Sequence, residues 1–128
     1  MPFSYVVYKE QRLVISTGSG RVTCAEIRER QDQTSNDPDF DSEFNQIVDL
    51  RAVTDFEVSI EEFRALARRR IFAPSSRRAF VAKDPHIFGM GRLWEIESET
   101  FDIETSKIHV FYDLASALHW IGVEALPQ

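Results

Sequence analysis

Cysteine is nearly absent from this chain of 128 residues, and long apolar runs are absent altogether. Because the single cysteine, Cys24, has no second cysteine to pair with, an intrachain disulfide is excluded. No apolar run approaches the roughly 20 residues that a membrane-spanning helix requires, so we expect no such helix. Residues 1–5 lack a basic stretch followed by an apolar run, and we therefore expect no signal peptide and a cytoplasmic protein.

Sequence motifs that mark common enzymes are also missing. The chain has no G-x-S-x-G, no phosphate-binding P-loop and no G-x-G-x-x-G. Its three histidines, His86, His109 and His119, do not have the spacing of a metal site. The acidic turn at 37–41 alternates carboxylates as a calcium loop does, but Ser42 replaces the required glycine. We therefore predict no catalytic group, no metal and no cofactor.

Positive charge is scarce overall, but it is concentrated. The formal net charge of −6 argues against nucleic-acid binding, which usually requires a basic face. Residues 68–78 nevertheless contain five arginines: Arg68, Arg69, Arg70, Arg77 and Arg78. Two interpretations stay open. These arginines are either solvated residues, three of which complement a helix dipole, or an anion-docking surface for an acidic partner or a phosphate-bearing ligand.

The same helix opening occurs twice, at 22–27 and at 58–63. In each copy a hydroxyl residue, Thr23 or Ser59, is followed three positions later by glutamate, which is the pattern of a capping box. Apolar residues flank both boxes with the spacing of a hydrophobic staple. Both sites therefore predict the start of a helix, and Ser59 has a structural task as its N-cap.

The remaining signals predict one α/β domain over 1–128. The composition, 43% hydrophobic, is that of a chain able to bury a core. Apolar periodicity and turn residues predict strands at 3–8, 12–17, 44–50, 78–83 and 107–112, with helices at 23–35, 59–71, 85–99 and 113–121. Gly18 to Gly20 should close the second strand, and a turn should occupy 51–58. Strands that alternate with helices require a largely parallel sheet, and the first hairpin adds an antiparallel edge.

Two stretches carry a family resemblance. The first is residues 47–54 (IVDLRAVT), which precede a serine-capped helix, and the second is residues 110–120 (VFYDLASALHW). Both resemble the anti-sigma-factor antagonist (STAS) domains, and in particular their uncharacterised bacterial STAS/SEC14-type branch. The resemblance implies a SpoIIAA-like fold, with a five-stranded, mostly parallel sheet and four helices. It further implies a non-enzymatic regulatory module that binds a protein partner or a small apolar or lipid-like ligand.

The resemblance also points to Ser59. In regulatory members of the family, a serine or threonine at the start of the helix after the third strand is phosphorylated by a partner kinase, and Ser59 occupies that position. The family's glycine after this residue is missing, and a phosphate would lie near Glu57, Glu61 and Glu62. Two roles of Ser59 therefore stay open: the N-cap of a helix and a phosphorylation switch.

Two segments that follow carboxyl ends of predicted strands are candidates for binding, because open α/β sheets bind ligands there. They are the turn at 54–59 and the start of the third helix at 86–91. The candidate ligand or partner residues are Asp55, Phe56, Glu57, Ser59, His86, Gly89 and Arg92. An alternative is an enzyme or sensor that uses Asp55, Glu57 and His86 as an acid/base set across one crevice. A homodimer through the first hairpin or through the Gly89 to Gly91 region is also possible from the sequence.

Overall fold

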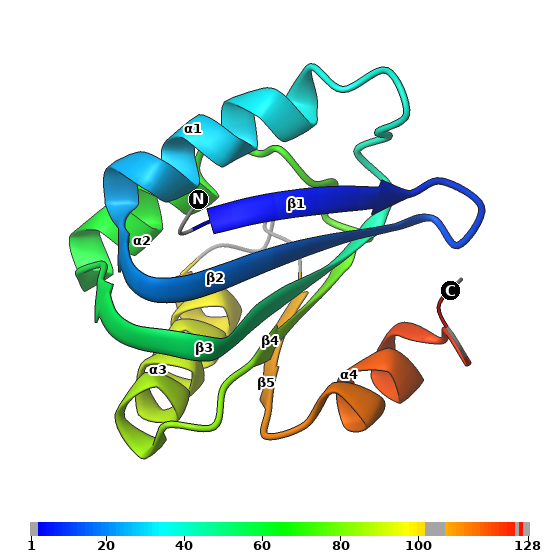
Figure 1. Cartoon of the computed structure of the whole chain (residues 1–128). Coiled ribbons are helices and arrows are strands. Elements are labelled where there is room, and N and C mark those ends of the chain that lie inside the picture. The colour runs from blue at the N-terminus through cyan, green and yellow to red at the C-terminus, as the bar shows by residue number, and fades with distance from the viewer. Residues whose placement is uncertain (1–2, 102–106, 125, 127–128) are drawn as a thin grey trace.

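The computed structural model describes residues 3–101, 107–124 and 126, which form one sheet with helices on both faces (Figure 1). The strands are β1 (Phe3–Tyr8), β2 (Leu13–Thr23), β3 (Asn45–Glu57), β4 (Arg77–Val81) and β5 (Lys107–Phe111). The helices are α1 (Cys24–Ser35), α2 (Ile60–Ala67), α3 (Pro85–Phe101) and α4 (Leu114–Ile121).

The order of strands in the sheet is their order in the sequence, β1-β2-β3-β4-β5. β1 pairs with β2 in antiparallel orientation, whereas the pairs β2/β3, β3/β4 and β4/β5 are parallel. The predicted fold class is therefore confirmed: within the described residues, the chain forms a five-stranded, mostly parallel sheet with an antiparallel N-terminal edge and four helices.

Three helices cover one face of the sheet, and α4 covers the other (Figure 1). Each of α1, α2 and α3 joins neighbouring parallel strands, and the sheet grows in one direction, so right-handed crossovers place all three on the same face. Phe63 of α2 and Trp94 of α3 pack there in one apolar cluster with Val48. After the last strand the chain passes to the opposite face, where Ala117 of α4 packs in a second cluster with Ala79.

Two strands are longer than the sequence predicts. We expected β2 to close at 18–20 and a turn to occupy 51–58, but β2 runs directly into α1 and β3 ends just before α2. The two extensions pair with each other, with two register shifts. Gly18 is buried within the strand, and a Cβ there would lie 2.9 Å from Val53 Cγ2. The glycine therefore permits close packing inside β2 and does not end the strand.

The predicted helix caps are confirmed. Thr23 and Ser59 each accept a hydrogen bond from the backbone N–H three residues later, at 3.4 and 3.1 Å. Glu26 and Glu62 in turn accept from the backbone N–H of their cap, at 3.1 and 3.0 Å. Helix α2 ends at Ala67, earlier than predicted, and a turn follows it.

Helix α3 extends to Phe101, past the predicted end at residue 99. On this helix Trp94 is buried, whereas Leu93 is 48% exposed. Its two glycines differ in their surroundings. A Cβ at Gly91 would lie 2.8 Å from Val110 Cγ2 on β5, so the glycine permits close packing there, whereas a Cβ at Gly89 would meet nothing within 4 Å.

Candidate functional site

A cavity lies between the sheet and the helices α1 and α2. Its volume is about 50 Å³, which is room for about four water molecules at roughly 10–15 Å³ each. Most of its wall is apolar, contributed by Val48, Phe56, Val58, Phe63, Leu66, Phe80 and Trp94. Six of the lining residues are partly exposed: Ile27, Gln31, Phe56, Ala67, Ile71 and Arg78. Of these, Gln31 on α1, Ala67 on α2 and Ile71 after α2 lie on the helical side of the cavity, which we call its rim.

Aromatic rings form a rigid wall on one side of this cavity. The indole of Trp94 stacks on Phe63 with 4.9 Å between ring centroids, and it meets Phe80 edge-on at 5.5 Å. Phe56 lies 5.2 Å from the same indole. Such aromatic pairs contribute about 0.5–1.5 kcal/mol each beyond the burial of their area, so this wall is held in place without a ligand.

The opposite end of the cavity is polar, and three strands supply its residues. Arg78 of β4 donates from Nε to Oε1 of Gln46 on β3 at 2.8 Å. Gln46 donates from Nε2 to the hydroxyl of Ser16 on β2 at 2.9 Å. Both Gln46 and Ser16 are buried. The chain of hydrogen bonds fixes the amide orientation of Gln46 and with it the position of the guanidinium.

Arg78 introduces a charge into this polar end. Burial lowers the pKa of its guanidinium to about 10, so the group remains protonated at neutral pH. Its Cζ lies 5.1 Å from the ring centroid of Phe72, a cation–π contact. Within the described part of the chain, Gln46 is the hydrogen-bond partner of Arg78, and no ion pair to Arg78 is formed.

A second arginine reaches the cavity from α1. Arg30 is buried, donates from Nε to the carbonyl of Phe3 at 2.5 Å and lies 3.2 Å from the carboxylate of Glu29. Thr34, one turn later, donates its hydroxyl hydrogen to the carbonyl of Arg30 at 2.8 Å. Two guanidinium groups therefore line the cavity, and none of the described lining residues is a carboxylate.

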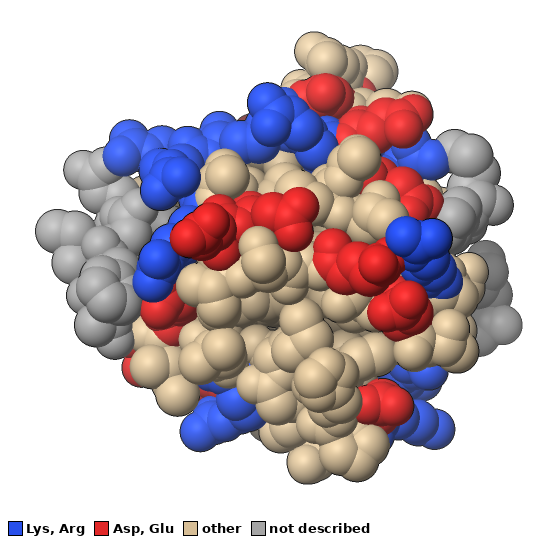
Figure 2. Space-filling view, turned by 90° about the vertical axis from the view of Figure 1, so that its left-hand side faces the viewer, with Lys and Arg blue, Asp and Glu red and all other residues tan. Residues whose placement is uncertain are grey.

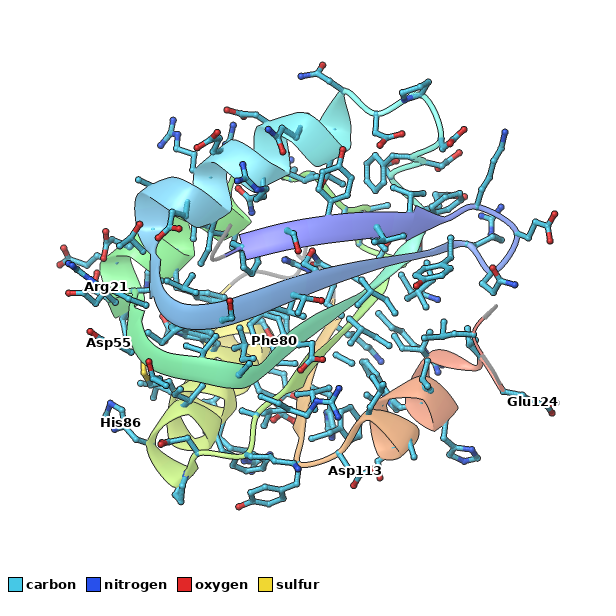
Figure 3. All side chains as sticks on the ribbon, in the orientation of Figure 1. Arg21, Asp55, Phe80, His86, Asp113 and Glu124 are labelled. Atoms are coloured by element: carbon cyan, nitrogen blue, oxygen red, sulfur yellow. The ribbon has the colours of Figure 1, made fainter. Side chains whose placement is uncertain are left out.

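Of the residues predicted from the sequence, Phe56 and Arg78 line this cavity. Asp55, Glu57 and His86 are exposed and are not part of its wall. The strand β3 occupies the segment in which we expected a turn, so Asp55 and Glu57 lie on a paired strand. Figure 3 shows Asp55 and His86 projecting outward from the same end of the molecule, away from the interior where Phe80 lies.

The proposed acid/base set is not connected by hydrogen bonds. Glu57 forms an ion pair with Arg21 of β2, and the backbone N–H of His86 donates to the carboxylate of Asp84 at 2.8 Å. Over the ranges that the structure describes, no hydrogen bond or ion pair joins Asp55, Glu57 and His86 to one another. These three side chains therefore do not line a common cavity, and the polar groups that do line one come from other residues.

Three other predicted residues, Ser59, Gly89 and Arg92, do not line the cavity. The hydroxyl of Ser59 caps α2, and the backbone N–H of Ser59 lowers the pKa of Glu62 by its hydrogen bond to that carboxylate. Gly89 is exposed on α3. Arg92 donates from Nη1 to Oε2 of Glu95 on the same helix at 2.9 Å. Whether Ser59 is ever phosphorylated stays a prediction.

The clustered arginines point in different directions. Arg69 binds α1 through the carbonyl of Arg28 and the side chains of Gln31 and Asp32. Arg77 and Arg78 are adjacent on β4 and therefore lie on opposite faces of the sheet. Arg77 donates to the carbonyl of Trp120 on α4 at 2.7 Å, whereas Arg78 faces the cavity.

The exposed Arg68 and Arg70 do not by themselves create a basic face. Figure 2 shows acidic and basic side chains interspersed over the upper part of the face that it presents, above a region with few charges. Opposite charges mixed in this way give no single-sign surface on that face, and long-range attraction of a polyanion needs such a surface.

The polar partners of Arg78 were not predicted from the sequence. Ser16 and Gln46 occupy inward-facing positions of β2 and β3, where the alternation of a strand calls for apolar side chains. Polar residues at such positions in two neighbouring strands indicate a buried polar group, and this was the signal in the sequence that could have pointed to the site. Their pairing with Arg78 depends on the sheet register, which places Gln46 beside Arg78, and that register is not visible in the sequence.

A carboxylate–imidazole pair at the edge of the sheet was not predicted either. Glu95 of α3 is buried, and its Oε1 lies 2.7 Å from Nδ1 of His109 on β5. The second oxygen of Glu95 accepts from Arg92, and the imidazole stacks on Trp120 at 5.3 Å. Glu95 thus fixes the orientation of the imidazole. Sequence spacing gave no signal, because α3 and β5 meet only through tertiary packing.

Other chemistry-bearing groups do not form a site. Burial raises the pKa of the Cys24 thiol, and the neighbouring carboxylate of Glu62 acts in the same direction, so this cysteine is not an activated nucleophile. In the segments described here, His, Cys, Asp and Glu side chains form no cluster of three that could hold a metal ion. No helix in these segments is long and apolar enough to cross a membrane.

Comparison with solved structures connects this architecture to a known fold. The chain is similar to an uncharacterized protein of the DUF3478 family from Shewanella loihica PV-4, which has a SpoIIAA-like fold. The two share 13% sequence identity with a TM-score of 0.57, over 93% of this chain and 91% of the other. This chain has a SpoIIAA-like fold. The expectation drawn from residues 47–54 and 110–120 is therefore confirmed at the level of the fold.

No model of a protein family matches the chain, and no curated protein matches it. At 13% identity, the similarity to this SpoIIAA-like protein shows the fold but assigns no role to any residue. The function has to be argued from the cavity and its polar end.

Proposed function

We propose that this protein is a non-enzymatic SpoIIAA-like binding module, and that it holds a small, largely apolar molecule in the cavity between the sheet and the helices α1 and α2. The observation that carries the proposal is the composition of the cavity wall, which is mostly apolar and aromatic, with a minority of hydrogen-bonding side chains from α1 and from three strands. Ligand sites in proteins typically have this composition, since apolar walls supply affinity and a few polar groups fix orientation.

The size of the cavity supports a small ligand. A volume of about 50 Å³ accepts a group of about four non-hydrogen atoms without any movement of the wall. A longer ligand has to leave through the rim, at Gln31, Ala67 and Ile71, or separate α1 from α2. Arg69, in the turn after α2, opposes such separation, because its guanidinium binds the carbonyl of Arg28 and the carboxylate of Asp32 on α1.

Xenon is a direct probe of this function, because it binds dry apolar cavities and makes no hydrogen bonds. Under xenon pressure, we expect amide shifts in the ¹⁵N-correlated NMR spectrum at Val48, Phe80 and Trp94. Ala67→Leu places a larger side chain at the rim and should reduce these shifts. Ala65→Leu on the exposed face of the same helix is the matched control and should leave them unchanged.

Both variants are first checked for a dispersed amide spectrum, which shows that they fold. If the wild-type protein shows no xenon-dependent shifts at the cavity residues, the proposed binding function is wrong. It is equally wrong if Ala67→Leu and Ala65→Leu respond to xenon in the same way, because the shifts then do not report on the cavity.

A further inference from the structure

We infer that the molecule held in the cavity is a short-chain monocarboxylate whose carboxylate binds Arg78. This inference rests on the binding function proposed above and specifies its ligand class. It follows from four observations: the guanidinium has no carboxylate partner, it is held in a fixed position, apolar residues lie next to it, and the cavity is small.

The first observation is the state of Arg78. Its Nε is occupied by Gln46, but its two terminal nitrogens make no hydrogen bond within the ranges that the structure describes, and no carboxylate pairs with it. Arg78 is partly buried at the cavity wall. A partly desolvated charge without a counter-ion is less stable than a solvated one, and an anion that binds it offsets this cost. The guanidinium fork matches a carboxylate, which accepts two parallel N–H bonds from it.

The second observation is that the cation is held in place before any ligand arrives. The amide oxygen of Gln46 accepts from Arg78, and its amide nitrogen donates to Ser16. The ring of Phe72 lies over the guanidinium. The terminal nitrogens are therefore presented by a fixed scaffold. A preorganised cation binds an anion with less loss of side-chain entropy than a flexible surface arginine does.

The third observation concerns what lies beside the cation. Val48 follows Gln46 by two positions on β3, and Phe80 follows Arg78 by two positions on β4, so all four side chains share one face of the sheet. Both Val48 and Phe80 are apolar lining residues. An alkyl chain attached to the bound carboxylate would extend along them, and a bare inorganic anion would leave this part of the cavity unfilled.

The cavity volume then limits the chain length. Propionate has five non-hydrogen atoms, close to the space of about four water molecules that the cavity offers. A ligand with so few non-hydrogen atoms makes few contacts, so a dissociation constant in the micromolar to millimolar range is expected.

The test compares sodium propionate with propionamide, a neutral molecule of the same shape. Each is titrated into the wild-type protein at constant ionic strength, and the amide shifts of Val48 and Phe80 are followed by NMR. We expect propionate to bind at least about tenfold more tightly than propionamide, because the amide has no charge and presents a donor in place of the second acceptor oxygen. Sodium chloride and sodium phosphate at the same concentrations should produce no comparable shifts.

Two arginine variants locate the effect. Arg78→Gln should weaken propionate binding by at least about tenfold and leave propionamide binding nearly unchanged. Arg77→Gln, on the adjacent residue of the opposite face, should change neither. If Arg78→Gln lacks a dispersed spectrum, Arg78→Lys replaces it, and this variant should bind propionate more weakly than the wild type because it loses the bidentate geometry.

The outcomes separate the inference from the function on which it rests. If xenon reaches the cavity but propionate and propionamide bind equally, or chloride and phosphate match propionate, the carboxylate inference is overturned and the apolar binding function stands. If xenon fails to reach the cavity and propionate shifts neither Val48 nor Phe80, both are overturned.

Discussion

Arg78 of β4 donates its Nε hydrogen to Oε1 of Gln46 on β3, and this bond holds the guanidinium at the polar end of the cavity. Gln46 is buried and Arg78 is partly buried, so water cannot fully replace the hydrogen bond between them. Removing one partner leaves a buried donor unsatisfied, which costs more than the hydrogen bond itself contributes.

Gln46→Leu should therefore destabilise the protein, although leucine is apolar and similar in size. The change leaves Arg78 Nε without its acceptor and the hydroxyl of Ser16 without its donor, and the expected loss is about 1–3 kcal/mol. Urea unfolding measures it. The control Gln33→Leu, on the exposed side of α1, should stay within about 0.5 kcal/mol of the wild type. Equal stability of the two variants would contradict this role of Gln46.

The two glycines of α3 should respond to alanine with opposite signs. Gly89→Ala should stabilise the protein by about 0.5–1 kcal/mol, because the site has space and alanine favours the helix. Gly91→Ala should destabilise it by about 1–3 kcal/mol, because the new Cβ would lie 2.8 Å from Val110 Cγ2. Thermal unfolding of both variants tests this contrast. A stabilising Gly91→Ala would show that α3 and β5 do not pack as described.

Ser59→Ala should cost about 1 kcal/mol, since alanine cannot accept the hydrogen bond from the N–H of Glu62. Ser59→Asp should retain most of the stability, because aspartate is also a good N-cap. Denaturant unfolding distinguishes the two variants, and equal losses would contradict the capping role. The phosphorylation prediction is separate: mass spectrometry of protein isolated from its native host would detect or fail to detect phosphate on Ser59.

Acidification should weaken the cap of α4. Hydrogen bonds from the backbone and side chain of Ser116 lower the pKa of Asp113 in the folded protein. A lowered folded-state pKa stabilises the fold at pH values above the pKa of the unfolded chain, near 4, and this stabilisation is lost as the pH falls through the folded-state pKa.

Asp113→Asn keeps a capping side chain but removes this titration. Between about pH 5 and pH 2, the melting temperature of the variant should therefore fall less steeply than that of the wild type. Parallel melting curves for the two proteins over this range would contradict the contribution of Asp113.

Local signals in the sequence were sufficient for the element order. The capping boxes at Thr23 and Ser59 and the apolar periodicity of the strands depend on residues close together in the chain, and the structure confirms them. Gly18 was misinterpreted because a glycine that ends a strand and one that admits a neighbouring side chain look alike in sequence. Only the contact with Val53 distinguishes them.

The candidate site depended on information that the sequence does not contain. Phe56 and Arg78 were among the residues singled out, but they were assigned to separate surfaces. Their common cavity arises from the register of β3 and β4 and from the packing of α1 and α2 over the sheet. The pair of Glu95 with His109 likewise depends on the approach of α3 to β5, which local spacing cannot predict.

The most direct test of this account is an isotope-filtered NOE measurement with ¹³C-labelled propionate bound to the ¹²C protein. The account predicts NOEs from the methyl group of propionate to the ring protons of Phe80 and the methyl protons of Val48, and it predicts that Arg78→Gln abolishes them at the same ligand concentration. NOEs that arise only from residues outside the cavity, or that persist unchanged in Arg78→Gln, would contradict it.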